Sequence, residues 1–387
     1  MLTEKELEAA IKQITDRLDA VNRLFVKKIA AQILKIGKLN QSSINRLVVM
    51  ADMGADVADI NRQLQAATAL NVKDLFRIYQ AALNDTYTDK RFRVFLQQRP
   101  MPQDQRDRLT RFAQNVSLQT AKTMQNLSNT TAVRQQYKDA VDRAITAVSS
   151  GLTDYQSAMR DTVRALGYNG MQVQYASGYH RRLDTAVRQN IVDGVNQINQ
   201  RASLAIGEAL EFDAIELSAH MHSAPDHEPV QGRVFLRSEF DKMQSGLDFV
   251  DVDGHRYAGF RRPIGEWNCM HIAMSFSTAH SIRRYTEEQL QGWAQANKQG
   301  CTFNGKHFTT YQARQYMRRL ETRIRREKDA ANAARAVEDD KLQQQCQIRI
   351  NNLTRRYYGL ASAAGITPRG NRLSVQGFKA VKVPKSK

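Results

Sequence analysis

Proline, cysteine and aromatic residues are all scarce in this chain. Its 387 residues include 7 prolines and 3 cysteines, and 7% of the residues are aromatic. Because proline interrupts helices and marks turns, so low a proline content favours a helix-rich protein. Three widely separated cysteines do not make a disulfide framework, and they indicate a reducing compartment.

Long apolar runs are also missing. The mean hydropathy is −0.56, and no apolar run approaches the roughly 20 residues that a membrane-spanning helix needs. The N-terminal stretch MLTEKELEAA lacks the basic start and the apolar core of a secretory signal. We therefore expect no secretory leader and no membrane partner.

The common catalytic signatures are absent as well. The sequence has no GxxxxGK[ST] phosphate loop, no G-x-S-x-G nucleophile turn, no GxGxxG after a strand and no HExxH motif. Each of these motifs fixes a nucleophile, a metal or a phosphate in one place, so their absence argues against the corresponding enzyme classes. We expect a protein that is not an enzyme.

Positive charge, by contrast, is abundant and unevenly distributed. The net charge is +18, and between Gln312 and Lys387 there are 18 basic residues against 6 acidic ones. Such a segment attracts polyanions through counterion release, although a solvated helical surface has the same composition. The predicted nucleic-acid contacts are Arg369, Arg372, Lys379, Lys382, Lys385 and Lys387.

Apolar residues recur with a helical period in two segments. The first set is Leu7, Ile11, Ile14, Leu18, Val21 and Phe25, and the second is Leu183, Val187, Ile191, Val195, Ile198 and Ala202. Steps of three and four residues put each set on one face of a helix. Near the middle of the chain the pattern changes to short strand-like runs between glycines and prolines. The predicted fold is mostly α with a central α+β island, an elongated helical N-terminal region and a long basic C-terminal helix.

These patterns divide the chain into five consecutive parts. They are a helical N-terminal region over 1–100, a long-helix region over 103–211, a histidine-rich α+β island over 212–308, a long basic helix over 309–358 and a basic tail over 359–387. Within the long-helix region we expect one helix to end near Gly167, a usual C-terminal stop. Because the tail has six basic residues and no acidic ones, we expect it to be mobile unless a partner orders it.

Six of the eight histidines lie in the island, between residues 220 and 280. His220 and His227 lie in one segment, and Cys269 and His271 lie about forty residues further on. Imidazole nitrogen and thiolate sulfur are ligands that zinc takes in a four-ligand tetrahedron. The four residues therefore form a candidate structural zinc site, provided that a hairpin brings the two segments together. Loop histidines also serve as hydrogen-bonding struts, and that reading stays open; we expect no cofactor other than this zinc.

Catalytic uses of the same residues have less support. A metal-dependent nuclease would use His255 as a general base and Asn268 to orient the reacting groups, but the spacing matches no nuclease pattern. Cys269 as a nucleophile would need His271 as its base and a third, orienting group, which the sequence does not reveal.

The residues of this central region also occur in the order found in one known family. The matching residues are Arg182, Asp184, Ala186, Val187 and Arg188; Gly194, Val195, Asn196 and Gln197; Ser218, Ala219 and His220; Pro225 and His227; Gln231, Gly232, Val234 and Phe235; and Trp267, Asn268, Cys269 and His271. In this respect the chain resembles the phage minor capsid proteins of the second type, which are distantly related to the Mu F-like head morphogenesis proteins. The resemblance covers about residues 150–360.

The chain departs from that family pattern at four places. Residues 222–224 replace a Gly-Ala-Arg, Val230 replaces a tryptophan, Glu266 replaces a glycine and Met270 replaces an arginine. Roles that need the missing arginine and tryptophan are therefore not carried over. The His, Cys and Gln-Gly framework is kept, which favours a fold-holding role for it.

The resemblance implies a virion structural protein, made in the bacterial host cytoplasm and located in the head near the portal. It implies as partners the portal protein, the major capsid protein, packaged double-stranded DNA and other copies of the chain. The implied role is to assist head assembly and DNA packaging or delivery. Two alternatives stay open, namely a nucleic-acid-binding module that acts outside the particle and a metal-dependent nuclease.

Overall fold

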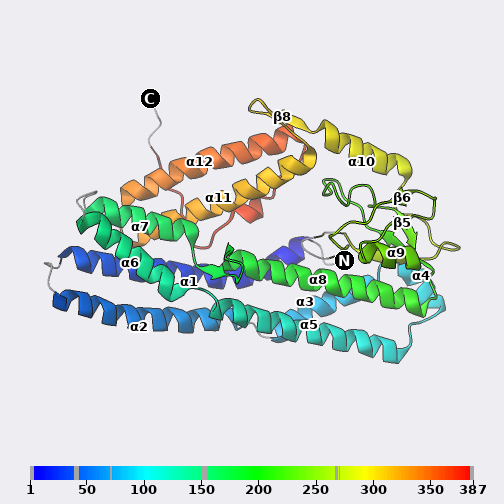
Figure 1. The fold of residues 1–387 in the computed structure, drawn as a ribbon, viewed down its shortest axis with the longest axis horizontal. Helices are drawn as coiled ribbons and strands as arrows, with labels where there is room; N and C mark the ends of the chain where they lie inside the picture. The colour runs from blue at the N-terminus through cyan, green and yellow to red at the C-terminus, as the bar shows by residue number, and fades with distance from the viewer. Residues whose placement is uncertain are drawn as a thin grey trace. The chain divides into compact units, whose positions relative to one another are not determined.

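The structure is a computed structural model that describes residues 4–38, 43–69, 72–149, 155–265, 269 and 271–383, and helices dominate it (Figure 1). The helices are α1 (Glu4–Lys38), α2 (Ser43–Thr68), α3 (Val72–Tyr87), α4 (Lys90–Gln98), α5 (Gln103–Asn129), α6 (Val133–Ser149), α7 (Tyr155–Asn169), α8 (Leu183–Ala209), α9 (Arg237–Gln244), α10 (Glu287–Gln299), α11 (Thr310–Ala336), α12 (Asp340–Ala363) and the short 3-10 helix η1 (Gly370–Leu373). Within the described ranges, every helix is too short or too polar to cross a membrane.

The strands are short and pair in antiparallel fashion. They are β1 (Gln172–Gln174), β2 (His180–Arg182), β3 (Ala214–Leu217), β4 (Val234–Leu236), β5 (Phe249–Val250), β6 (Arg256–Tyr257), β7 (Ala273–Phe276), β8 (Cys301–Phe303) and β9 (Lys306–Phe308). A mostly helical chain with small sheets in its central part is the fold class that the sequence predicts, and the structure confirms it.

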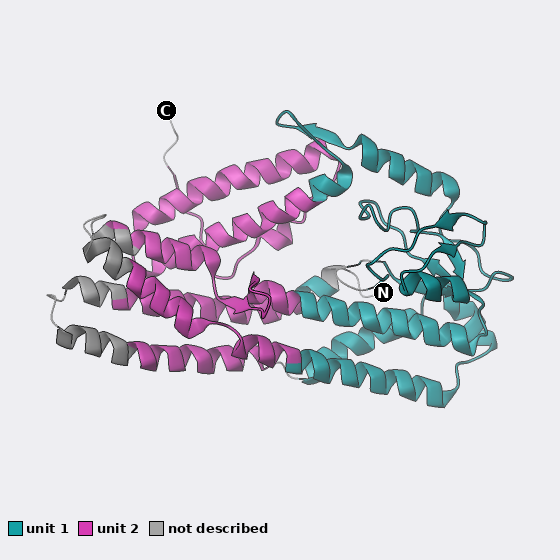
Figure 2. Cartoon of the chain, viewed as in Figure 1, with its two compact units in different colours: residues 1–10, 71–122, 189–314 teal, residues 11–70, 123–188, 315–387 magenta. Residues whose placement is uncertain are grey.

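The chain divides into two compact units, which Figure 2 shows in teal and magenta. Unit 1 combines residues 1–10, 71–122 and 189–314, and unit 2 combines residues 11–70, 123–188 and 315–387. Unit 1 therefore contains the whole island, and unit 2 contains most of both the N-terminal and the C-terminal helices. Each unit joins segments that are distant in the sequence.

Both apolar stripes lie where their periods predict. On α1 the side chains of the stripe are buried from Ile11 to Phe25, and on α8 they are buried from Leu183 to Ala202. Each helix therefore contributes one continuous face to a core, and its polar residues are left on the other faces.

The helix α7 continues past Gly167, so the predicted stop is wrong by two residues. Gly167 serves instead as a contact with α11 inside unit 2. A Cβ atom at this position would lie 2.7 Å from the Ala330 Cα atom and 2.9 Å from the Ala333 Cβ atom. The absence of a side chain lets the two helix backbones approach closely, and the alanines on α11 complete that fit.

The predicted long basic helix over 309–358 is two helices rather than one. The break falls at Glu338, whose φ of 57° lies in the left-handed region. The Asp339 carboxylate then accepts a hydrogen bond from the Leu342 backbone N–H and caps the N-terminus of α12. Its other oxygen accepts from the Arg160 Nε at 2.8 Å. An aspartate that caps a helix start explains why the run of helix-forming residues does not continue through this point.

The C-terminal segment that we expect to be mobile packs on unit 2 as far as it is described. The backbone carbonyl of Gln376 accepts hydrogen bonds from Arg23 of α1 and Asn332 of α11. The Lys328 ammonium donates to the Leu373 carbonyl and lies 5.0 Å from the centre of the Phe378 ring. We call residues 365–378 the C-terminal strap, because they join α1 to α11.

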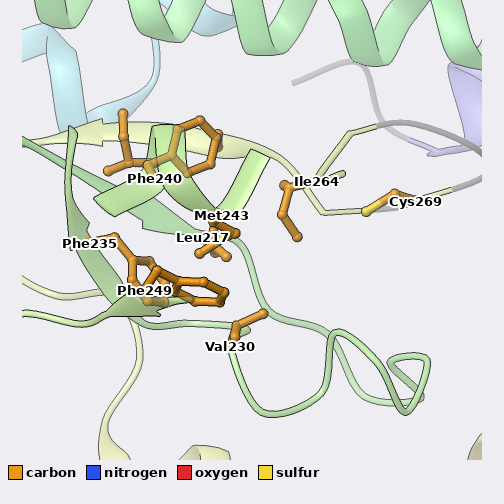
Figure 3. Packing of buried hydrophobic residues seen from close by; sticks show 10 residues of the cluster. Leu217, Val230, Phe235, Phe240, Met243, Phe249, Ile264 and Cys269 are labelled. Carbon is orange, nitrogen blue, oxygen red and sulfur yellow. The ribbon is translucent and has the colours of Figure 1, made fainter. Parts of the chain in front are cut away.

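The island of unit 1 is built on a three-stranded sheet in the order β4-β3-β7. The sheet packs on α8, where the Ser203 hydroxyl accepts a hydrogen bond from the Ser275 backbone N–H of β7 at 2.8 Å. A Cβ atom at Gly207 would lie 2.1 Å from the Ser275 Oγ atom, so only glycine permits this approach. Its apolar core gathers Leu217, Val230, Phe235, Phe240, Met243, Phe249, Ile264 and Cys269 (Figure 3).

Candidate metal centre

The register of the sheet brings the two histidine-bearing segments together. Leu217, at the end of β3, pairs with Ala273, at the start of β7. The pairing continues one step further, because the Ser218 backbone N–H donates to the Ile272 carbonyl at 2.9 Å and the Ser218 hydroxyl accepts from the Ile272 N–H at 2.8 Å. The loop after β3 and the segment before β7 therefore lie side by side.

Three of the four predicted ligands converge in this place. The Cys269 Sγ atom lies 3.4 Å from the His227 Nδ1 atom and 3.5 Å from the His271 Nδ1 atom. All three ligand atoms lie within 4.8 Å of one another. The exposed fractions of His227, Cys269 and His271 are 0%, 3% and 3%, so the group is closed to bulk water.

His220 lies beside this group rather than within it. Its ring stacks on the ring of His271, with 4.6 Å between the ring centres. Its Nδ1 atom lies 3.2 Å from the Met221 carbonyl oxygen, and its backbone N–H donates to the Gln231 side chain. His220 therefore supports the His271 ring by contact.

Each imidazole of the group is oriented from its far side. The His227 Nε2–H donates to the Arg262 carbonyl at 2.8 Å, and a carbonyl can only accept. The His271 Nε2 atom lies 3.3 Å from the Ser223 hydroxyl and 3.4 Å from the Gln231 amide oxygen. With the proton on Nε2 in both rings, both Nδ1 lone pairs point toward the cysteine sulfur.

Burial sets the charge of these three groups. It lowers the pKa of His227, and it lowers the pKa of His271 to about 3, since desolvation penalises the imidazolium form. Burial also raises the pKa of the Cys269 thiol. Two neutral imidazoles therefore face one sulfur at neutral pH. A nucleophilic cysteine needs a lowered pKa, so this environment opposes the use of Cys269 as a nucleophile.

An ion pair closes the group on one side. The Arg262 guanidinium donates to both oxygens of Asp226, at 2.7 Å and 2.9 Å, so its charge is balanced. The same guanidinium lies 3.4 Å from the His227 Nδ1 atom, which is a long and weak contact. The backbone carbonyl of Arg262 thus contacts His227 more closely than the Arg262 side chain does.

A second group of potential ligands, Asp251, Asp253 and His255, also converges in the island. The buried carboxylate of Asp251 accepts hydrogen bonds from the backbone N–H groups of Asp253 and His255 and from the Tyr257 hydroxyl. Its Oδ2 atom lies 2.9 Å from the His255 Nδ1 atom. Asp253 forms a two-bond ion pair with Arg283. These hydrogen bonds and this ion pair give the two carboxylates a structural role, because they hold the turn between β5 and β6.

Of the two residues considered for a nuclease, the structure describes one. His255, the suggested base, is held by Asp251, and Asn268 lies outside the described residues. Ser223 and Arg262, which orient the two imidazoles from outside, carry no signal in the sequence. Gln231 carried a signal, because it belongs to the Gln-Gly block of the family pattern.

The predicted nucleic-acid contacts differ in accessibility. Lys379 and Lys382 are exposed, whereas Arg369 and Arg372 are partly covered. The Arg372 guanidinium lies 3.9 Å from the Glu321 carboxylate of α11. Lys385 and Lys387 lie outside the described residues. The tail therefore offers fewer free cations than its composition indicates.

Comparison with known proteins identifies the family. The sequence model of the family described as "Phage minor capsid protein 2" matches residues 2–358, which is nearly the whole chain. A search of curated proteins found no similar sequence, and a search of solved structures found no similar structure. The chain belongs to the phage minor capsid protein 2 family, and this membership supports a virion structural role.

Proposed function

We propose that this minor capsid protein is a non-enzymatic component of the phage head that lies next to the portal and contacts packaged DNA through α11 and α12. Membership in a minor capsid family supports the virion role. The observation that carries the DNA contact is the segregation of charge on the two C-terminal helices.

The acidic residues of α11 face inward. Glu321, Glu327 and Asp329 have exposed fractions of 7%, 4% and 5%, respectively. Glu327 pairs with Arg164 of α7, and Asp329 pairs with Arg182, both inside unit 2. Because these carboxylates are neutralised in the interior, they do not offset the basic residues on the surface.

The exposed residues of the same segment are mostly basic. Between 312 and 383 the exposed basic residues are Arg319, Arg323, Arg335, Lys341, Arg355, Arg356, Lys379 and Lys382, and the exposed acidic residues are Glu338 and Asp340. Folding therefore makes this surface more basic than the composition of the segment alone indicates. A surface of this kind neutralises phosphates and releases their counterions.

Part of this charge forms one patch. Arg319 and Arg323 are four residues apart and share a face of α11. The Arg356 guanidinium of α12 donates to the Tyr316 hydroxyl at 2.8 Å, which places Arg356 about one turn from Arg319. We call Arg319, Arg323 and Arg356 the basic patch. Arginines suit the phosphate backbone and require no particular base sequence.

The DNA contact is tested by the salt dependence of binding. The full chain is titrated with double-stranded DNA of random sequence at several salt concentrations. Replacing Arg319 and Arg323 together by glutamine removes two phosphate contacts, so the slope of log K against log salt should become less negative by about 1.8. The matched control replaces Arg62 and Arg108, which are exposed on other helices. Equal losses of binding in both variants would exclude a specific role for the basic patch.

The location in the head is tested on purified particles. Quantitative mass spectrometry should find the chain at a fixed, low ratio to the portal protein, and cross-linking should join it to the portal and to the major capsid protein. Absence of the chain from DNA-filled particles would refute the proposal. Retained DNA binding together with that absence would favour a DNA-binding protein that acts outside the particle.

A further inference from the structure

We propose that His227, Cys269 and His271 bind one zinc ion, which fastens the loop after β3 to the start of β7. This inference does not depend on the proposed place of the protein in the head. It follows from the ligand geometry, from the orientation of the two imidazoles and from the local shortage of regular structure.

The two sulfur-to-nitrogen distances of the group are those of a zinc tetrahedron. Zinc binds thiolate sulfur at about 2.3 Å and imidazole nitrogen at about 2.0–2.1 Å, which at tetrahedral angles separates sulfur from nitrogen by about 3.5–3.6 Å. The observed separations from Cys269 Sγ are 3.4 Å to His227 Nδ1 and 3.5 Å to His271 Nδ1. An ion therefore fits between these atoms with little movement of the side chains.

The hydrogen-bond count favours a cation over a thiol proton. Two Nδ1 lone pairs converge on Cys269, and a neutral thiol has one proton to share between them. The remaining lone pair of His227 then has only the long 3.4 Å contact with Arg262. One cation satisfies both lone pairs and the thiolate at once inside this buried site.

The surroundings match those of known zinc ligands. Metal-bound histidines donate their other ring N–H to a carbonyl, a carboxylate or a water molecule, and these partners fix the ring orientation. The Arg262 carbonyl has this role for His227, and the Gln231 amide oxygen has it for His271. One thiolate and two imidazoles select zinc over magnesium and calcium, which prefer oxygen.

The site would stabilise a part of the island that has little secondary structure of its own. Residues 218–233, between β3 and β4, contain turns but neither helix nor strand. His227 belongs to this loop, and Cys269 and His271 lead into β7. A metal that joins them closes the loop onto the sheet, and its binding free energy becomes folding free energy.

The test measures metal content in the full-length chain. Protein from zinc-supplemented cells, purified without chelators, should contain one zinc per chain. Cys269→Ser and His271→Ala should each lose that zinc. The matched control is Cys301→Ser, because Cys301 is also a free, buried cysteine in unit 1. A metal-free wild-type protein that stays metal-free after zinc is added would overturn the proposal, and so would full retention of zinc by Cys269→Ser.

A second measurement covers the case in which these variants fail to fold. Cobalt is exchanged for zinc in the wild-type protein, which needs no substitution. The cobalt form should show a thiolate-to-metal charge-transfer band. Cobalt bound without any sulfur band would place the metal away from Cys269 and would also overturn the proposal.

Discussion

Replacing Asp19 by asparagine should stabilise unit 2 above pH 7 and flatten its dependence on pH. Burial, together with repulsion from Asp329 and Asp184, raises the pKa of Asp19 from 3.8 to about 7. The three carboxylates surround Arg182, which lies 2.8 Å from Asp329 and 3.0 Å from Asp184. One guanidinium does not balance three carboxylates, so Asp19 keeps its proton in the folded state.

The sign of the effect follows from proton linkage. The folded state holds the Asp19 proton up to about pH 7, whereas the unfolded chain releases it near pH 3.9. Folding stability therefore falls as pH rises through this window and is constant above it. Each unit of pKa corresponds to about 1.36 kcal/mol, so the shift of Asp19 changes the free energy of unfolding by at most about 4 kcal/mol. Sharing of the proton with Asp329 reduces the effect, and we expect about 2–3 kcal/mol.

Asp184 opposes this trend only at lower pH. Burial acts to raise the pKa of Asp184, but Arg182 and Arg325 outweigh it and hold the pKa at about 2. Its contribution is present above the unfolded pKa of about 3.9 and is lost as pH falls toward 2. Within the same window the lowered pKa values of His227 and His271 act in the opposite direction, because stability is lost as pH falls below the ordinary imidazole pKa of 6.5. The difference between the wild type and Asp19→Asn therefore isolates the contribution of Asp19.

The assay is urea unfolding of the full chain, followed by far-ultraviolet circular dichroism at several values between pH 4.5 and pH 8.5. The urea midpoint of Asp19→Asn relative to the wild type should rise from pH 4.5 to about pH 7 and stay constant above it. The control is Asp74→Asn on α3, where an exposed carboxylate pairs with exposed Arg77. Parallel pH profiles for the wild type and Asp19→Asn would refute the reasoning.

Two further changes test the packing of the fold. Gly207→Ala should destabilise the island by about 1–3 kcal/mol, because the new methyl group overlaps Ser275. Gly54→Ala should instead stabilise α2 by up to about 1 kcal/mol, because there is open space around the new methyl group. Thermal melts of the two variants should move in opposite directions, and a shared direction would contradict the assigned contact. Asp339→Ala should cost about 0.5–2 kcal/mol, because it removes the cap at Leu342. An unchanged urea midpoint would show that the cap does not stabilise α12.

The sequence predicts those features that depend on local repetition. The period of three and four residues from Ile11 to Phe25 requires one buried helix face, whatever that face packs against. The sequence makes the metal site conditional on the meeting of the two His-bearing segments, and the pairing of β3 with β7 meets that condition. Three of the four proposed ligands then converge on one point, and the geometry leaves His220 outside.

Features that depend on a distant partner are not visible in the sequence. In the sequence Gly167 resembles a helix stop. In the structure it contacts Ala330 and Ala333, which lie about 160 residues further along the chain. Asp339 lies within the predicted long helix over 309–358, whereas its carboxylate caps α12 and binds Arg160. In each case the local sequence is compatible with two structures, and a tertiary contact determines which of them forms.

The C-terminal strap has a consequence for the time course of synthesis. Arg23 and Gln376, which bond to each other, are 353 residues apart. At a translation rate of roughly 5–20 residues per second, this partner is synthesised about 20–70 s after α1. Unit 2 is therefore completed last, after the island has left the ribosome. A truncation before residue 365 would leave α1 and α11 without the segment that joins them, however well the remaining chain folds.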